Sequence, residues 1–138
     1  YQKFNAFVEY LLITKSIDFD ADAFKVMLTN TAPVSTNSVK ADLTEISAGN
    51  GYTAGGTATT ISHSRSTGTS KIVGTDVVFT ASGGSIGPFR YAVLYDDTPI
   101  SPADPLIGFW DYGSSITLAS GETFTVDFDA TNGVFQLT

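Results

Sequence analysis

The chain has 138 residues, of which 42% are hydrophobic and 15% charged, so it is long enough to bury one core. A net charge of −7 and the lack of any basic run argue against nucleic-acid binding, which Lys and Arg drive. The absence of cysteine excludes disulfides and thiolate metal sites, and no apolar run reaches the roughly 20 residues of a membrane helix. We therefore expect one domain over residues 1–138 that binds neither nucleic acid nor a membrane.

The N-terminal stretch is predicted to form an amphipathic helix over about residues 2–15. Its apolar side chains have the spacing that places them on one stripe of a helix, with polar residues opposite. This stripe consists of Phe4, Phe7, Val8, Leu11 and Leu12. We expect the stripe to pack on a sheet; the alternative is that it docks on a partner chain.

Three aspartates follow this helix with the alternate spacing that begins calcium-binding loops: Asp18, Asp20 and Asp22. The remainder of such a loop is missing, because no glycine follows the third aspartate and the twelfth position is Thr29. Calcium binding is therefore the weaker hypothesis, and carboxylates on the wet face of an extended segment are the stronger one. A strand is predicted over residues 23–29.

The middle of the chain is predicted to be largely irregular. A loop around Pro33–Val39 is followed by one short helical turn, with Leu43 and Ile46 expected to face inward. Residues 57–70 are almost wholly Thr, Ser and Gly, which predicts an exposed edge strand or a hairpin arm. This stretch contains the only histidine, His63, for which we expect a surface role.

Apolar and polar residues alternate through most of the second half, which is typical of strands with one buried and one solvated face. A strand is expected over residues 77–81 and ends at two glycines. The central strand of the sheet is predicted within residues 88–97. We expect one of its faces to carry Phe89, Tyr91, Val93 and Tyr95.

The chain is predicted to end in a turn followed by strands. The turn spans residues 96–105 and contains Pro99 and Pro102. Near the C-terminus Phe124, Val126 and Phe128 alternate with polar residues, and Asn132-Gly133 is a strong hairpin signal. The pattern therefore predicts an all-β fold, mainly an antiparallel β-sandwich, with one N-terminal α-helix.

No combination of residues in the sequence indicates catalysis. A nucleophilic hydrolase needs a base and an orienting group, but His63 is the only imidazole and no G-x-S-x-G elbow occurs. A glycosidase needs two facing carboxylates, and Asp111, Asp127 and Asp129 lie near aromatic residues, as in many acidic β proteins. We expect no enzyme activity and no cofactor.

Four aromatic residues suit either a sugar-stacking platform or a sandwich core: Tyr95, Phe109, Trp110 and Tyr112. A core role is the more common one. Because Phe109 and Trp110 are adjacent, a strand directs them to opposite faces. One of the two is expected to lie away from the main core or under the N-terminal helix, where it is a candidate for a subunit contact.

The order of segments resembles that of small proteins encoded in the structural gene modules of tailed bacteriophages. The matching segments are NAFVEYLL, DADAFKVMLTN, ADLTEISAGNGYTAGG, DVVFTASGGSI, RYAVLYDDT and DPLIGFWDYG, followed by an aromatic, Thr-rich C-terminal stretch. The resemblance covers nearly the whole chain and implies a virion component with no catalytic residues. It includes capsid and tail proteins alike.

From these observations we expect a capsid decoration (cement) protein that forms homo-oligomers and binds the major capsid protein, located in the virion and assembled in the host cytoplasm. One alternative is a tail fibre, tip or baseplate-associated module; another is a carbohydrate-binding module. The expected contact residues lie on the outward side of the helix, in the loop at Pro33 and Val39, in the turn at Pro99 and Pro102, and at Phe109 or Trp110.

Overall fold

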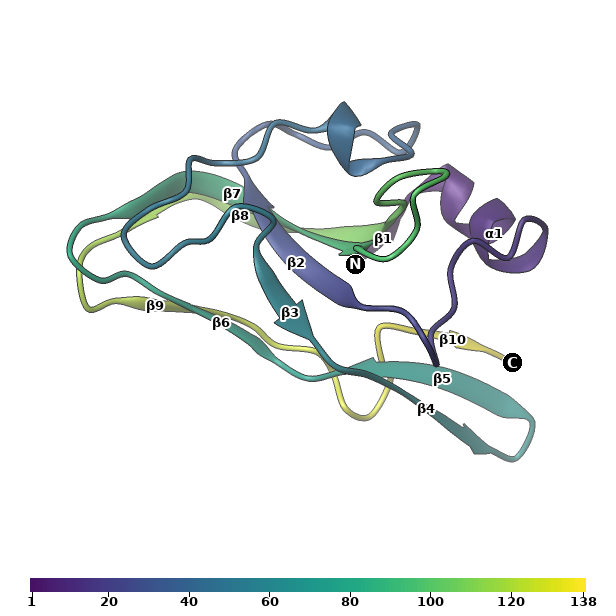
Figure 1. The fold of residues 1–138 in the computed structure, drawn as a ribbon. Helices are drawn as coiled ribbons and strands as arrows, with labels where there is room; N and C mark the ends of the chain where they lie inside the picture. The colour runs from purple at the N-terminus through teal and green to yellow at the C-terminus, as the bar shows by residue number, and fades with distance from the viewer.

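The computed structural model describes residues 1–138 and consists mostly of antiparallel strands, with one α-helix near the N-terminus (Figure 1). Neither helical segment has the length and hydrophobicity needed to cross a lipid bilayer. The elements in chain order are β1 (Gln2–Lys3), α1 (Asn5–Leu12), β2 (Phe24–Thr29), the 3-10 turn η1 (Lys40–Asp42), β3 (Thr57–Thr59), β4 (Ile61–Ser66), β5 (Thr69–Gly74), β6 (Val77–Thr80), β7 (Ile86–Asp96), β8 (Leu106–Leu118), β9 (Thr123–Val126) and β10 (Phe135–Leu137).

The main sheet has five strands in the order β1-β8-β7-β2-β3, and every neighbouring pair is antiparallel. β7 lies at its centre, which confirms the prediction of a central strand. β7 and β8 form a long hairpin, and β2 pairs along the other side of β7 from Phe24–Asp96 to Thr29–Tyr91. The predicted strand over residues 23–29 is therefore confirmed as β2.

The second layer is built from two stretches of chain that run side by side, residues 69–80 and 123–137. In these stretches β6 pairs with β9, β5 pairs with β10, and β4 adds to the outer side of β5 (Figure 1). The layer packs against the main sheet and completes an all-β, sandwich-like fold, as predicted. We call β4 and β5, residues 61–74, the β4–β5 arm; it is the hairpin arm expected from the Thr- and Ser-rich sequence.

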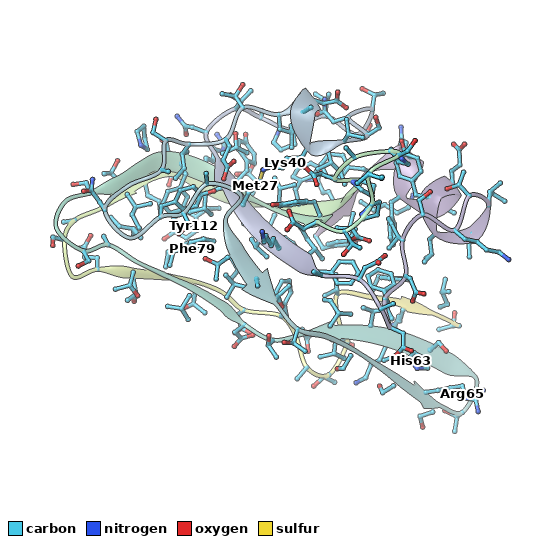
Figure 2. The ribbon with its side chains drawn as sticks, viewed as in Figure 1. Met27, Lys40, His63, Arg65, Phe79 and Tyr112 are labelled. Atoms are coloured by element: carbon cyan, nitrogen blue, oxygen red, sulfur yellow. The ribbon has the colours of Figure 1, made fainter.

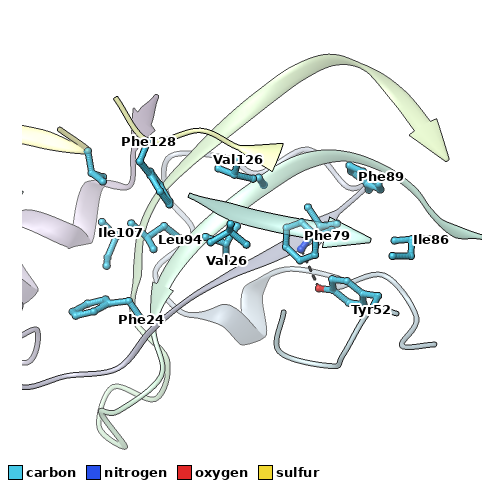
Figure 3. Packing of buried hydrophobic residues seen from close by; sticks show 14 of the residues in the cluster. Phe24, Val26, Tyr52, Phe79, Ile86, Phe89, Leu94, Ile107, Val126 and Phe128 are labelled. Carbon is cyan, nitrogen blue, oxygen red and sulfur yellow. Dashed lines mark hydrogen bonds between the residues drawn. The ribbon is translucent and has the colours of Figure 1, made fainter. Parts of the chain in front are cut away.

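The main core lies between these two layers (Figure 3). Phe24, Val26 and Leu94 of the main sheet face Phe79 and Val126 of the second layer, and all five are at most 5% exposed. Removing so much apolar surface from water, at roughly 25 cal/mol per Å², is the main stabilising contribution to the fold. As predicted, Val126 and Phe128 are buried and Phe124 packs on the core, while the intervening residues are exposed.

A second, smaller core covers the opposite face of the main sheet. It consists of Phe4, Met27, Tyr91, Val93, Tyr95, Leu106 and Phe109, with Leu43 packed against it. Backbone hydrogen bonds hold the segment around η1 over this face, from Ile46 N to Leu28 O (3.1 Å) and from Leu106 N to Ser38 O (2.9 Å). The prediction that one face of β7 is solvated is therefore wrong: a loop rather than a strand layer covers it.

The predicted face of β7 is also interrupted. The register between β7 and β8 shifts between Phe89 and Tyr91, as expected of a β-bulge. Phe89 therefore joins the main core with Ala92 and Leu94, whereas Tyr91 lies in the second core. Strict alternation fails here: Phe89 and Tyr91 are two residues apart in β7 but face opposite cores, at the point where β8 contributes the additional residues between Asp111 and Ile116.

The N-terminal helix is shorter than predicted. Gln2 and Lys3 pair with Phe109 and Gly108 as strand β1, Phe4 is extended, and α1 begins only at Asn5 and ends at Leu12. Tyr1 lies directly against Gly108, where a Cβ on the glycine would collide with the tyrosine ring. Only part of the predicted stripe packs inward: Phe4 and Phe7 are buried, whereas Val8 and Leu12 are exposed.

The predicted C-terminal hairpin around Asn132-Gly133 is wrong. A turn does form there, closed by a 2.7 Å hydrogen bond from Gly133 N to Asp129 O. The flanking strands β9 and β10 do not pair with each other, because the stretch formed by β5 and β6 provides a separate partner for each of them. Pairing with this long stretch satisfies more backbone groups than an isolated two-stranded hairpin could.

Truncation of a buried side chain in the main core tests this packing. Leu94→Ala removes a completely buried side chain and should lower the free energy of unfolding by about 2–5 kcal/mol. Val78→Ala, in an exposed position of β6, should cost about 1 kcal/mol or less. Urea denaturation followed by tryptophan fluorescence measures both, and equal losses would contradict the assigned core.

Candidate functional site

The three segments expected to make contacts lie together at one end of the molecule. Asn5 N at the start of α1 donates to Ser35 O in the 33–39 loop at 2.9 Å, and Lys40 N donates to Asp104 O in the 97–105 turn at 2.9 Å. An isolated bridge joins Val39 to Pro105. We call the surface formed by α1, the segment just after it, the 33–39 loop and the 97–105 turn the helical end (Figure 1).

Exposed apolar side chains are concentrated at the helical end. Nine large hydrophobic side chains are exposed: five belong to the helical end, two to the chain termini beside α1, and Val78 and Tyr112 to other parts of the fold. Ile100 at the tip of the turn is 93% exposed and Ile13 after the helix is 76% exposed. We therefore take this surface as the candidate functional site, since large apolar patches are rare on proteins without partners. The other members, on the helical end or the chain termini beside it, are Tyr1, Val8, Leu12, Val34 and Leu137.

A groove of about 760 Å³ lies between α1 and the β4–β5 arm. Its apolar lining includes Leu11, Ile17 and Phe19, and the polar residues Lys15 and His63 also border it. Figure 2 shows His63 and Arg65 on the projecting arm. The groove has the size of a ligand or peptide site, but its walls offer no convergent set of catalytic groups.

Not all the predicted contact residues are available at the surface. Pro33 is buried, and Val39, Pro99 and Pro102 are half-buried. Their neighbours are exposed instead, Val34 after Pro33 and Ile100 after Pro99. Val34 and Ile100 are each an apolar residue beside a proline in a loop, outside any strand pattern. This was the sequence signal that could have identified them.

Phe109 and Trp110 point to opposite faces of β8, as predicted. Phe109 is 5% exposed and packs in the second core, with its ring 5.2 Å from that of Phe4. Trp110 lies between Tyr1 and Phe128, at ring distances of 5.3 and 5.4 Å. Contacts within the chain therefore cover most of both side chains.

The four aromatic residues considered for sugar stacking do not form one platform. Tyr95 and Phe109 are buried in the second core. Trp110 and Tyr112 instead border a small groove of about 160 Å³ between β8 and β9, together with Asp127. Only half of the predicted platform is thus accessible to a ligand.

Two of the three aspartates of the calcium hypothesis, Asp18 and Asp22, stabilise their own loop through their carboxylates. A carboxylate oxygen of Asp18 accepts a hydrogen bond from Asp20 N at 2.9 Å, and one of Asp22 accepts from Asp18 N at 2.8 Å. No group of three or more His, Asp or Glu side chains is placed to hold a metal ion. The structure therefore does not bring these carboxylates together as ligands.

The candidate catalytic groups are far from a catalytic arrangement. His63 Nε2 lies 3.2 Å from Ser70 Oγ, a partner the sequence did not reveal, but no carboxylate hydrogen bond orients the exposed ring. Asp111 accepts two hydrogen bonds from Arg90, at 2.7 and 2.8 Å, which lower its pKa to about 2. Asp111 therefore remains ionised and cannot act as a general acid near neutral pH. Asp129 caps the turn before β10.

Asp96 anchors the turn of the helical end and was not predicted. It is completely buried at the end of β7, where one carboxylate oxygen accepts from Thr98 N at 3.0 Å and the other has no partner. Thr98 in turn accepts a hydrogen bond from Ala23 N at 2.7 Å. Burial raises the pKa of Asp96 to about 7, and the neighbouring carboxyl of Asp22 contributes to the rise.

The raised pKa of Asp96 predicts that stability falls from acid to neutral pH. The folded state holds the proton of the Asp96 carboxyl more tightly than the unfolded chain does. The resulting contribution to the free energy of unfolding is complete below about pH 4 and is lost as the pH rises through about 7. The loss is on the order of 4 kcal/mol, since each pKa unit corresponds to about 1.4 kcal/mol. Urea denaturation between these pH values should show the decline in the parent, and Asp96→Asn should abolish it.

Asp20→Asn is the matched control, because Asp20 is an exposed carboxylate two residues before Asp22, the neighbour of Asp96. It should leave the decline unchanged. An equal decline in Asp96→Asn and the parent would contradict the assignment.

No protein-family model, curated protein or solved structure matches the chain. What the chain does must therefore be inferred from its own residues and their geometry. The feature that distinguishes its surface is the grouping of exposed apolar side chains around α1.

Proposed function

We propose that this chain is a bacteriophage virion structural protein that decorates the capsid, binding the major capsid protein through its helical end and binding its own copies. The observation that carries the proposal is the concentration of exposed apolar side chains around α1, including Leu12, Ile13 and Ile100, beside an open groove. A surface of this kind favours docking on another protein. The resemblance of the segment order to phage structural proteins supports the virion setting.

The remaining surface supports attachment by one end. The four residues of β6 and the four of β9 expose mainly Thr side chains, with Val78 as the exception. A small protein that binds a shell through one apolar end presents a polar opposite end to solvent. Repetition over many copies then gives avidity even when each contact is weak.

The groove between β8 and β9 favours carbohydrate binding as the second candidate function. Trp110 and Tyr112 border it, and Asp127 and the Arg90–Asp111 pair supply polar groups. Flat rings beside hydrogen-bonding groups suit the two faces of a sugar. At about 160 Å³ the groove would hold a single ring.

The copy number of the chain in purified particles tests the proposed function. Quantitative mass spectrometry against the major capsid protein should give a ratio near one or a simple fraction of it. A ratio on the order of a few per cent would mean only a few copies per particle, too few for avidity over the shell. That result would favour a tail role over decoration. Absence from particles would contradict both virion roles and favour the carbohydrate site.

Charge placed in the helical end should prevent docking without unfolding the chain. Ile13→Asp and Ile100→Asp each alter a side chain that is at least 76% exposed, so the free energy of unfolding should change little. Binding to particles that lack the protein should weaken about tenfold or more, because the aspartate must be desolvated at the interface. Co-sedimentation with particles measures this. Val78→Asp, on β6, is the control, and equal weakening there would contradict the assigned surface.

A further inference from the structure

Strand β4 is an edge strand whose outer side is unpaired. It pairs with β5 alone, in an unbroken register from Ile61–Gly74 to Ser66–Thr69. In Figure 1 it is the outermost strand of the β4–β5 arm, and five of its six residues are exposed. Edge strands are usually protected from a further strand by proline, a bulge or several charges. β4 contains neither proline nor a bulge, and Arg65 carries its only charge at pH 7.

The hydrogen bonds of the arm show which residues of β4 point outward. Thr75 N donates to Thr60 O at 2.9 Å, so Thr60, just before β4, directs its backbone groups toward β5 and its continuation. Because this direction alternates along an antiparallel strand, the even-numbered serines of β4 also point toward β5. The backbone N–H and C=O groups of Ile61, His63 and Arg65 therefore face outward and are free to bind a further strand.

These outward groups match those of a second β4 strand. A twofold axis perpendicular to the sheet makes two copies of an edge strand antiparallel. With the axis at His63, this residue pairs with its own copy, and Ile61 pairs with Arg65 of the second copy. Every outward N–H and C=O group of β4 then has a partner. An axis at Ser62 or Ser64 would leave one outward residue of each copy without a partner in β4.

The same register brings opposite charges together. Ile61 and His63 line the groove of about 760 Å³, whose lining also includes Asp18, Asp20 and one lysine. Arg65 lies on the same face of β4, because it follows His63 by two residues. Arg65 of one copy, opposite Ile61 of the second, is thus on the face that carries the carboxylates of that copy. The β4–β5 arm has no carboxylate, so the second copy supplies the anionic partners that its own arm lacks.

We infer that β4 pairs with β4 of a second copy about a twofold axis at His63, which joins the second layers of two molecules into one continuous sheet. Pairing of this kind uses the same edge on both copies, so it stops at a dimer. One strand pair with exposed ion pairs gives a weak contact, which repetition on a particle would strengthen. The role of the dimer on a particle rests on the proposed function, whereas the pairing itself does not.

A scan with single cysteines tests the register directly, because the chain has no cysteine of its own. Paired residues of antiparallel strands have Cα atoms about 5.5 Å apart, within the range of a disulfide. Only the residue on the axis faces its own copy, so mild oxidation should cross-link His63→Cys into a dimer. In Ser62→Cys and Ser64→Cys the two thiols lie on diagonal positions, roughly 7–8 Å apart between Cα atoms, and should cross-link far less. Ser66→Cys, also exposed, is the control for random collision.

Sedimentation equilibrium of the purified chain tests the association without any particle. It is run at about pH 8, where imidazoles are neutral and the two that meet at the axis do not repel each other. The average mass should rise with concentration toward that of a dimer. His63→Pro should give a monomer, because it removes an outward N–H from each copy and leaves the pairing with β5 intact. Arg65→Glu should weaken association roughly tenfold or more by placing like charges together, whereas Lys3→Glu on β1 should associate like the parent.

Four results would overturn the inference: a monomer at every concentration, a mass beyond that of a dimer, cross-linking that is not strongest at position 63, or equal association of Arg65→Glu and Lys3→Glu. The cysteine variants keep the inference testable if His63→Pro fails to fold, because they alter only exposed side chains. Failure of self-association and absence of the chain from particles are separate results, so this inference and the proposed function can fail independently.

Discussion

Burial of β7 on both faces is the constraint on which the rest of the structure depends. Leu94 faces the second layer, whereas Val93 and Tyr95 face the loop that carries η1, and all three are completely buried. A chain of this length has too few strands left to cover the second face with another sheet. The loop over residues 30–47 covers it instead, held by hydrogen bonds to β2 and β8, and Lys40 lies 5.2 Å from the ring of Tyr95.

This arrangement explains why the apolar surface gathers at one end. The covering loop and the 97–105 turn meet beside α1, where neither sheet reaches their apolar side chains. Val34, Ile100 and Leu12 remain exposed as a result. Asp96 lies at the same end of the molecule. It accepts a hydrogen bond from the 97–105 turn at the end of β7, while its second carboxylate oxygen has no hydrogen-bond donor.

Many of the acidic residues serve the local structure of loops. Asp18, Asp42 and Asp129 accept hydrogen bonds from backbone amides in their own turns. Such hydrogen bonds to a carboxylate stabilise a turn. Part of the acidic character of the chain therefore serves to hold its loops. The proposed function places the contact with the shell at the helical end.

The sequence by itself determined the elements that depend on local patterns. The alternation around Val126 and Phe128, strand β2 and the exposed β4–β5 arm follow from periodicity and composition, and all were predicted. The tertiary structure alone decided which face each strand buries and which strands pair. The bulge before Tyr91, the separate partners of β9 and β10, and the exposure of Ile100 all depend on segments distant in the sequence. Local patterns record the preference of a residue for burial, but only long-range contacts decide what covers it.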